Sequence, residues 1–112
     1  LDHFIPWSFV THDLSWNLIP SNPSINSSKS DRIPDLDFYL PKLSCAHHSA
    51  IKTYCSLGKS EKALEDYISL GYTVRELLEM PQDKFLEIFH QTFSPMAQIA
   101  CNMGFEQWQY HE

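Results

Sequence analysis

The sequence is poor in glycine and cysteine, carries little positive charge and has no long hydrophobic run. Its 112 residues include three glycines and three cysteines. No apolar run approaches the about 18 residues that mark a membrane-spanning helix, and no basic stretch followed by an apolar one opens the chain. Secreted and membrane-spanning proteins are therefore unsupported classes, and we expect a cytoplasmic protein with no membrane partner.

The cysteines, Cys45, Cys55 and Cys101, are odd in number and widely spaced. Such a set forms no disulfide framework and fits a reducing cytoplasm. Cys45 and His48 stand three residues apart on an expected helix, where they could begin a zinc site if distant cysteines completed it. Isolated cysteines are more often buried free thiols, and we expect that outcome here.

An excess of basic residues is also missing. Eight basic side chains face fourteen acidic ones, which gives a net charge of −6. Residues 1–58 carry four basic and five acidic side chains, whereas residues 59–112 carry four and nine. The acidity belongs mainly to the second half and need not face a phosphate, but binding to a nucleic acid would need a metal or residues outside this chain.

What is present is enough apolar material for one folded domain, with 43% hydrophobic and 13% aromatic residues. Residues 1–5 resemble the end of a strand, residues 6–13 a loop, and residues 15–19 a second strand closed by Pro20. A turn follows, and then a short polar helix from about Pro23 to Asp31 that ends before Pro34. The fold prediction is α+β, with a ββα core at 1–34 and a helical portion of the same domain at 35–112.

The second half is helical in its spacing. Gly58, Gly71 and Gly104 mark expected helix ends, and Thr73 with Glu76 fits a capping box. Ser94-Pro95 either kinks one helix or caps a new one. Each helix should bury one apolar stripe. The expected stripes are Leu43, Ala46, Ala50, Tyr54 and Leu57; Ala63, Leu64, Tyr67 and Ile68; Val74, Leu77 and Leu78; and Phe85, Ile88, Phe89 and Phe93.

The first 34 residues contain the residue types that phosphodiester hydrolysis uses. A histidine titrates near neutrality and suits the role of a general base. Carboxylate and amide oxygens suit Mg²⁺, which keeps several waters and takes few protein ligands. Asp2 and His3 would point to opposite faces of a regular strand, but at a strand end that enters a loop both can turn toward one phosphate.

These residues resemble the HNH nuclease family in order and spacing. The positions that carry the resemblance are Asp2-His3, Pro6, Asn17, Asn26, Lys29-Ser30-Asp31 and Pro34. Over residues 2–34 the pattern is similar to the HNH domain of the CRISPR RNA-guided DNA endonuclease. More weakly, the ending from Phe93 to Trp108 is similar to the tails of bacterial restriction-type HNH proteins.

The resemblance implies a role for each matching position. Asp2 and Asn26 would hold a metal ion, and His3 would be the general base that activates water. Asn17 would shape the loop between the strands through side-chain hydrogen bonds, and Lys29 would contact a phosphate near the cut. The implied cofactor is Mg²⁺, with Mn²⁺ as a substitute, and the implied reaction is cleavage of DNA.

The resemblance also sets expectations about partners. One such site cuts one strand, so double-strand cleavage would require a homodimer or another second site. The first strand is nearly missing before Asp2, which suggests further upstream residues of a longer parent chain and an isolated segment that can be inactive. Two alternatives stay open: a non-catalytic nucleic-acid-binding or protein-binding module built on the HNH fold, and the nuclease domain of a larger RNA-guided effector.

Two side-chain expectations complete the prediction. Arg32 could contact a phosphate or pair with Asp35, three residues along. Trp7 and Trp16 should pack the loop against the helix rather than stack on bases.

Overall fold

The computed structural model describes residues 2–19, 29, 31–58 and 61–108, with the side chains of residues 61–63 excepted. It is a mixture of helices and very short strands, as the α+β prediction requires. Elements η1 and η2 are 3₁₀ helices. In chain order the elements are β1 (Asp2–His3), α1 (Trp7–Val10), η1 (Ser15–Asn17), β2 (Leu18–Ile19), β3 (Ile33–Pro34), α3 (Leu36–Ser56), η2 (Glu61–Leu70), α4 (Val74–Glu79), α5 (Gln82–Asn102) and β4 (Gln107–Trp108).

Two pairs of short strands connect distant parts of the chain. β1 pairs antiparallel with β2, so that Asp2 lies opposite Ile19 and His3 opposite Leu18. β3 pairs parallel with β4, which brings the end of the chain back beside residues 33–34. Both strands of the first pair lie within the segments expected to form the two strands of a ββα unit, residues 1–5 and 15–19. The predicted helix of this unit falls mostly on residues 20–28 and 30, outside the described residues, although Lys29 itself is helical.

The expected strand at residues 15–19 is only partly correct. Its first three residues form the 3₁₀ turn η1, and the strand β2 is limited to two residues. Asp66 of η2 holds this turn, because its carboxylate accepts hydrogen bonds from both the backbone N–H and the hydroxyl of Ser15, at 2.9 and 2.8 Å. The loop before it contains a further difference, the one-turn helix α1.

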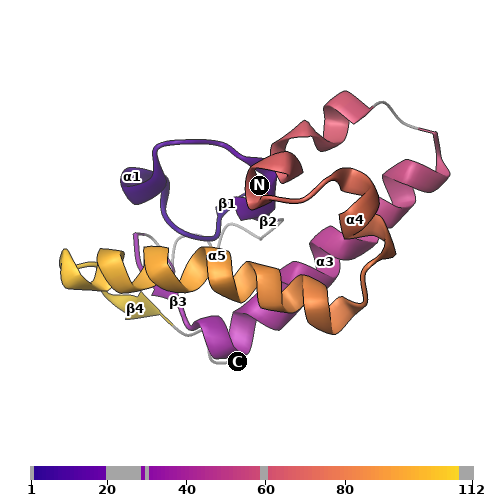
Figure 1. Ribbon diagram of the computed structural model, residues 1–112. Helices are drawn as coiled ribbons and strands as arrows, with labels where there is room; N and C mark the ends of the chain where they lie inside the picture. Colours follow the sequence, from indigo (N-terminus) through magenta and orange to yellow (C-terminus); the bar gives the residue numbers. More distant parts are fainter. Residues whose placement is uncertain (1, 20–28, 30, 59–60, 109–112) are drawn as a thin grey trace.

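Two long helices, α3 and α5, pack along each other and form the body of the molecule (Figure 1). The predicted Phe85, Ile88, Phe89 and Phe93 stripe of α5 is confirmed, since all four side chains are buried. α5 runs as one helix through Pro95, so the alternative of a new helix capped at Ser94-Pro95 was wrong. The Thr73–Glu76 capping box is present at the start of α4.

The predicted buried face of α3 was wrong beyond Leu43. Ala46, Tyr54 and Leu57 are exposed. The helix instead buries a neighbouring face that includes two histidines, and this pattern was missed because histidine does not score as apolar. The buried residues are Leu40, Leu43, Ser44, His47, His48 and Ile51.

The stripe predicted for residues 63–68 was wrong at Ile68, which is 57% exposed. The segment forms a 3₁₀ helix, which has three residues per turn. Its buried residues, Leu64, Tyr67 and Leu70, are accordingly spaced by three rather than by three and four. The geometry of the helix therefore moved the buried face away from Ile68.

One hydrophobic core joins both ends of the chain. Phe4 and Trp16 from the first segment meet Phe93 of α5 edge-on, with ring centroids 5.3 and 5.4 Å apart. The indole N–H of Trp16 also donates to Ser69 Oγ at 2.8 Å. The helical portion thus supports the segment that carries the candidate site.

The three cysteines are free, but none is fully buried, so the expectation of buried thiols was wrong. Cys45 is exposed, and the ring nitrogens of His48 lie 2.7 Å from Gln82 Oε1 and 2.9 Å from the Leu77 carbonyl oxygen instead.

The described residues hold no group of three or more His, Cys, Asp or Glu side chains that could bind a metal. In the same part of the chain, no helix is both long and apolar enough to cross a membrane.

Candidate nuclease site

A surface hollow of about 370 Å³ lies where β1 leads into α1. Asp2 and His3 both contribute to its wall, although they are neighbours in a strand. A strand of only two residues leaves the chain free to turn at once, so the two side chains reach one space. The described residues that line the hollow are Asp2, His3, Pro6, Trp7, Ser8, Lys29 and Asp31.

His3 is held by hydrogen bonds on both its ring and its backbone. Its Nε2 lies 2.8 Å from Asp13 Oδ1, and its backbone N–H donates to Asp2 Oδ1 at 2.8 Å. Its carbonyl oxygen accepts from the ammonium of Lys29 at 2.7 Å. In neutral His3, a carboxylate beside Nε2 favours the tautomer with the proton on that nitrogen. The lone pair is then on Nδ1, the ring nitrogen that can accept a proton.

Asn17 fixes the chain immediately after His3. It is fully buried, and its Oδ1 accepts from the Ile5 N–H at 2.8 Å while its Nδ2 donates to the Ile5 carbonyl at 2.9 Å. The Asn17 carbonyl accepts from the Phe4 N–H at 2.7 Å. Buried backbone groups need such partners, so one asparagine satisfies the turn between β1 and α1.

Lys29 turns inward rather than toward solvent. Its side chain is 6% exposed, and its ammonium lies 3.9 Å from Asp2 Oδ2 as well as against the His3 carbonyl. Burial lowers the pKa of this amine, and the nearby carboxylates of Asp2 and Asp31 act in the opposite direction. The lysine therefore ties residue 29 to β1 and places a basic group on the wall of the hollow.

The strand behind His3 is anchored from α3. His47 Nε2 lies 2.9 Å from the carbonyl oxygen of Leu18, the residue paired with His3, and His47 Nδ1 lies 2.6 Å from the Tyr67 hydroxyl. Burial lowers the pKa of His47 and raises the pKa of Tyr67 to about 12. A neutral His47 that donates to Leu18 and accepts from Tyr67 satisfies all three groups.

The oxygen donors at the hollow suit a hard divalent cation. Asp2 and Asp31 both line it, and Mg²⁺ commonly takes only one or two carboxylates and completes its shell with water. Asn26, the second expected ligand, lies outside the described residues. The carboxylates of Asp2 and Asp31 are thus donors of the type that such an ion takes.

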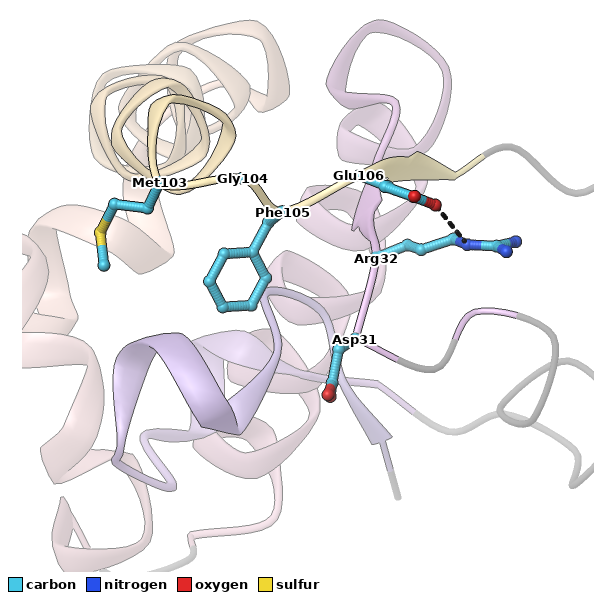
Figure 2. Close-up of a pocket in the computed structure, with 6 residues that line it drawn as sticks. All are labelled: Asp31, Arg32, Met103, Gly104, Phe105 and Glu106. Carbon is cyan, nitrogen blue, oxygen red and sulfur yellow. Dashed lines mark ion pairs between the residues drawn. The ribbon is translucent and has the colours of Figure 1, made fainter.

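The expected pair between Arg32 and Asp35 was wrong, and the alternative, a contact with a phosphate, stays a prediction. The Arg32 Nε lies 3.5 Å from Glu106 Oε2 rather than beside Asp35 (Figure 2). The pair borders a second hollow of about 420 Å³, also lined by Met103, Gly104 and Phe105. Asp31 lines both this hollow and the candidate site. An exposed pair of this kind contributes little stability, so Arg32 can exchange Glu106 for another anion.

Sequence reasoning missed Asp13, the partner of His3, and gave the wrong position for Trp7, which lines the hollow. Asp13 contacts His3 across ten residues of chain, and an aspartate after a histidine in a loop gave no signal of its own. Trp7 was expected to pack inward but is 52% exposed, whereas Trp16 is buried as expected. The position of Trp7 directly after Pro6, as the first residue of a one-turn helix, was the available clue.

The comparisons with known proteins agree with the resemblance in the first segment. Residues 1–35 match the family model described as HNH endonuclease, which confirms the identification of this segment. The match contains Asp2, His3, Asn17, Asn26 and Lys29 and indicates nuclease-family ancestry, with a nucleic acid as the implied substrate. Comparison with the curated proteins and with the solved structures gave no match.

Proposed function

Because residues 1–35 match the HNH endonuclease family, we propose that this protein hydrolyses phosphodiester bonds of DNA at the hollow beside β1. The observation that carries the proposal is the pairing of His3 Nε2 with Asp13 Oδ1 next to Asp2. A histidine oriented by a carboxylate and placed beside an oxygen ligand is the arrangement that metal-assisted hydrolysis requires.

In the proposed reaction, His3 acts as the general base. Nδ1 takes a proton from the attacking water while Nε2 keeps its proton and donates to Asp13. The imidazolium that forms gains a charge-assisted hydrogen bond to that carboxylate. Lys29 and Asn17 act by position: the first holds the His3 carbonyl, and the second holds both backbone groups of Ile5.

Asp2 and Asn26 would hold the metal ion, Mg²⁺ or in its place Mn²⁺. When bound, such an ion supplies positive charge for the phosphate and the leaving oxygen. Asp2 lies within 3.9 Å of the Lys29 ammonium.

One hollow of this kind serves one strand. Cutting both strands of a duplex therefore needs a second site, and a homodimer would supply it. Within the described residues the hollow has few basic groups, so the affinity for DNA should rest mainly on the metal, with Arg32 as an exposed basic side chain nearby. These features favour a nuclease that nicks in isolation.

The direct test is cleavage of supercoiled plasmid by the full chain with Mg²⁺, beside an EDTA control. His3→Ala should slow cleavage by about 100-fold or more, as loss of a general base does. His90→Ala is the matched control, because His90 lies on α5 and does not line the hollow. Equal cleavage by the His3→Ala variant would refute the assignment of the base.

A non-catalytic binding module is the second candidate, and the net charge of −6 favours it. The two functions differ in their response to metal. A titration with Mg²⁺ followed by NMR should shift the Asp2 and Asn26 signals in a nuclease. A binding scaffold should show no change confined to those two residues, while still binding DNA or a protein.

A further inference from the structure

Trp7 is an exposed aromatic side chain at the wall of the candidate site. Its side chain is 52% exposed, whereas Trp16 and Trp108 are 5% and 7% exposed. It lines the same hollow as Asp2 and His3. A large indole surface left in water beside a candidate site costs hydrophobic free energy, and such surfaces commonly mark a binding contact.

The local fold explains why Trp7 points outward. Pro6 starts α1, and the helix ends one turn later at Thr11, which has the left-handed φ of 54°. The second half of the turn faces the protein: Phe9 meets Phe105 edge-on with ring centroids 5.7 Å apart, and Val10 packs against the core. The inward positions of the turn are thus filled, and the first position is left to the hollow.

The charges at the hollow make an uncharged contact valuable. Two of the described residues lining it, Asp2 and Asp31, are acidic, and the basic Lys29 already donates to the His3 carbonyl. The whole chain carries a net charge of −6. Ion pairing alone is therefore a weak means for this surface to hold a polyanion, whereas an aromatic ring contributes without charge.

We propose that Trp7 stacks on a nucleobase of the strand that is cut, next to the phosphate at His3. This inference rests on the proposed function, since it takes the occupant of the hollow to be a nucleic acid. An indole can stack fully only on a base whose face is free. The structure thus assigns the substrate class: a strand with an unpaired base at the cut, as in single-stranded, looped or mismatched DNA.

The test distinguishes the contribution of the bases to binding from that of the phosphates. Binding of a fluorescent oligothymidylate is compared with binding of the abasic strand of equal length. EDTA prevents cleavage, and low salt keeps the phosphate contacts strong enough to measure without the metal. The wild-type chain should bind the strand with bases about 5- to 150-fold more tightly, the range of a base–aromatic stack. Trp7→Leu keeps an apolar side chain and should abolish the preference, while Trp7→Phe keeps a ring and should retain most of it.

Two controls make the result specific to Trp7. Tyr54→Leu removes a comparably exposed ring, 41% exposed on α3, and should leave the preference unchanged. Trp7→Leu should weaken binding to the strand with bases at every salt concentration without changing the slope of log Kd against log salt, because stacking releases no counterions. A preference that survives in Trp7→Leu, or one that the wild-type chain lacks, would show that Trp7 does not read bases.

The outcome is independent of the cleavage assay. A wild-type protein that prefers bases through Trp7 but, with Mg²⁺, cuts neither the plasmid nor a single-stranded or mismatched strand would keep this inference and refute the nuclease proposal. A protein whose cleavage depends on His3, but whose base preference does not depend on Trp7, would support the nuclease proposal and refute this inference. A duplex with one mismatch, compared with the perfect duplex, then tests the substrate class: Trp7 predicts faster cleavage of the mismatched strand.

Discussion

His3 Nε2 and Asp13 Oδ1 lie 2.8 Å apart, joined across the loop that contains α1. The relationship orients the imidazole, because a donor at Nε2 leaves the lone pair at Nδ1. The Asp13 side chain is 75% exposed, so its pair with His3 contributes little to stability. Asp13 instead orients the His3 ring and places a negative charge beside it. This pairing gives the first of four predictions.

Asp13→Asn should slow cleavage about fivefold to tenfold, because the amide oxygen still accepts from Nε2 but offers no charge to the imidazolium. Single-turnover cleavage with saturating Mg²⁺ measures the effect. In a His3→Ala background the same substitution should change nothing. A full effect of Asp13→Asn without His3 would mean that Asp13 acts elsewhere.

Asn17→Leu should lower the free energy of unfolding by about 2–5 kcal/mol, because it leaves both Ile5 backbone groups buried without a partner. Asn17→Asp is the informative companion: its carboxylate can accept from the Ile5 N–H but cannot donate to the Ile5 carbonyl. Urea denaturation should therefore place wild type above both variants, since the Asp variant also buries a charge against a carbonyl oxygen. Equal stability of all three proteins would contradict the role of the amide.

Lys29→Met should lower the free energy of unfolding by about 1–3 kcal/mol, because the His3 carbonyl loses a charge-assisted hydrogen bond. Lys52→Met is the control, since Lys52 is exposed on α3 and should shift stability by less than about 0.5 kcal/mol. Chemical denaturation of both variants at neutral pH checks the difference. If Lys29→Met unfolded like wild type but failed to bind DNA, Lys29 would act on a phosphate instead.

Features set by local sequence were predictable from the chain alone. The Thr73–Glu76 capping box depends on four consecutive residues, and the α5 stripe depends on aromatic side chains at helical spacing. The expectation that a short strand could turn Asp2 and His3 toward one space also agrees with the hollow that both line. In each case the physical cause acts over a few residues.

Features set by distant contacts were not predictable. β3 and β4 pair across more than seventy residues of chain, and neither two-residue strand carries a pattern of its own. His47 and His48 are buried on α3 because Leu18, Tyr67, Leu77 and Gln82 give their rings partners. The partner of His3, Asp13, likewise depends on how the loop closes.

The last prediction concerns His47 and the pH dependence of stability. In the unfolded chain His47 titrates near its ordinary pKa of about 6.5. Burial lowers its pKa in the folded protein. The unfolded state therefore binds more protons than the native state just below pH ~6.5, and the stability contributed by neutral His47 is lost as the pH falls through that window. Tyr67, with a pKa of about 12, stays protonated and continues to donate to His47.

His47→Gln should be less stable than wild type near neutrality but should lose less stability on acidification. Thermal unfolding at about pH 7.5 and about pH 5 gives, for each protein, the loss of stability on acidification. His90→Gln should lose as much stability as wild type. The Leu18 carbonyl is hydrogen-bonded to His47, and Leu18 is the strand partner of His3. Acidification should therefore also speed the hydrogen exchange of backbone amides around Leu18. Identical losses of stability for wild type and His47→Gln would show that His47 is not the group whose protonation loosens β2.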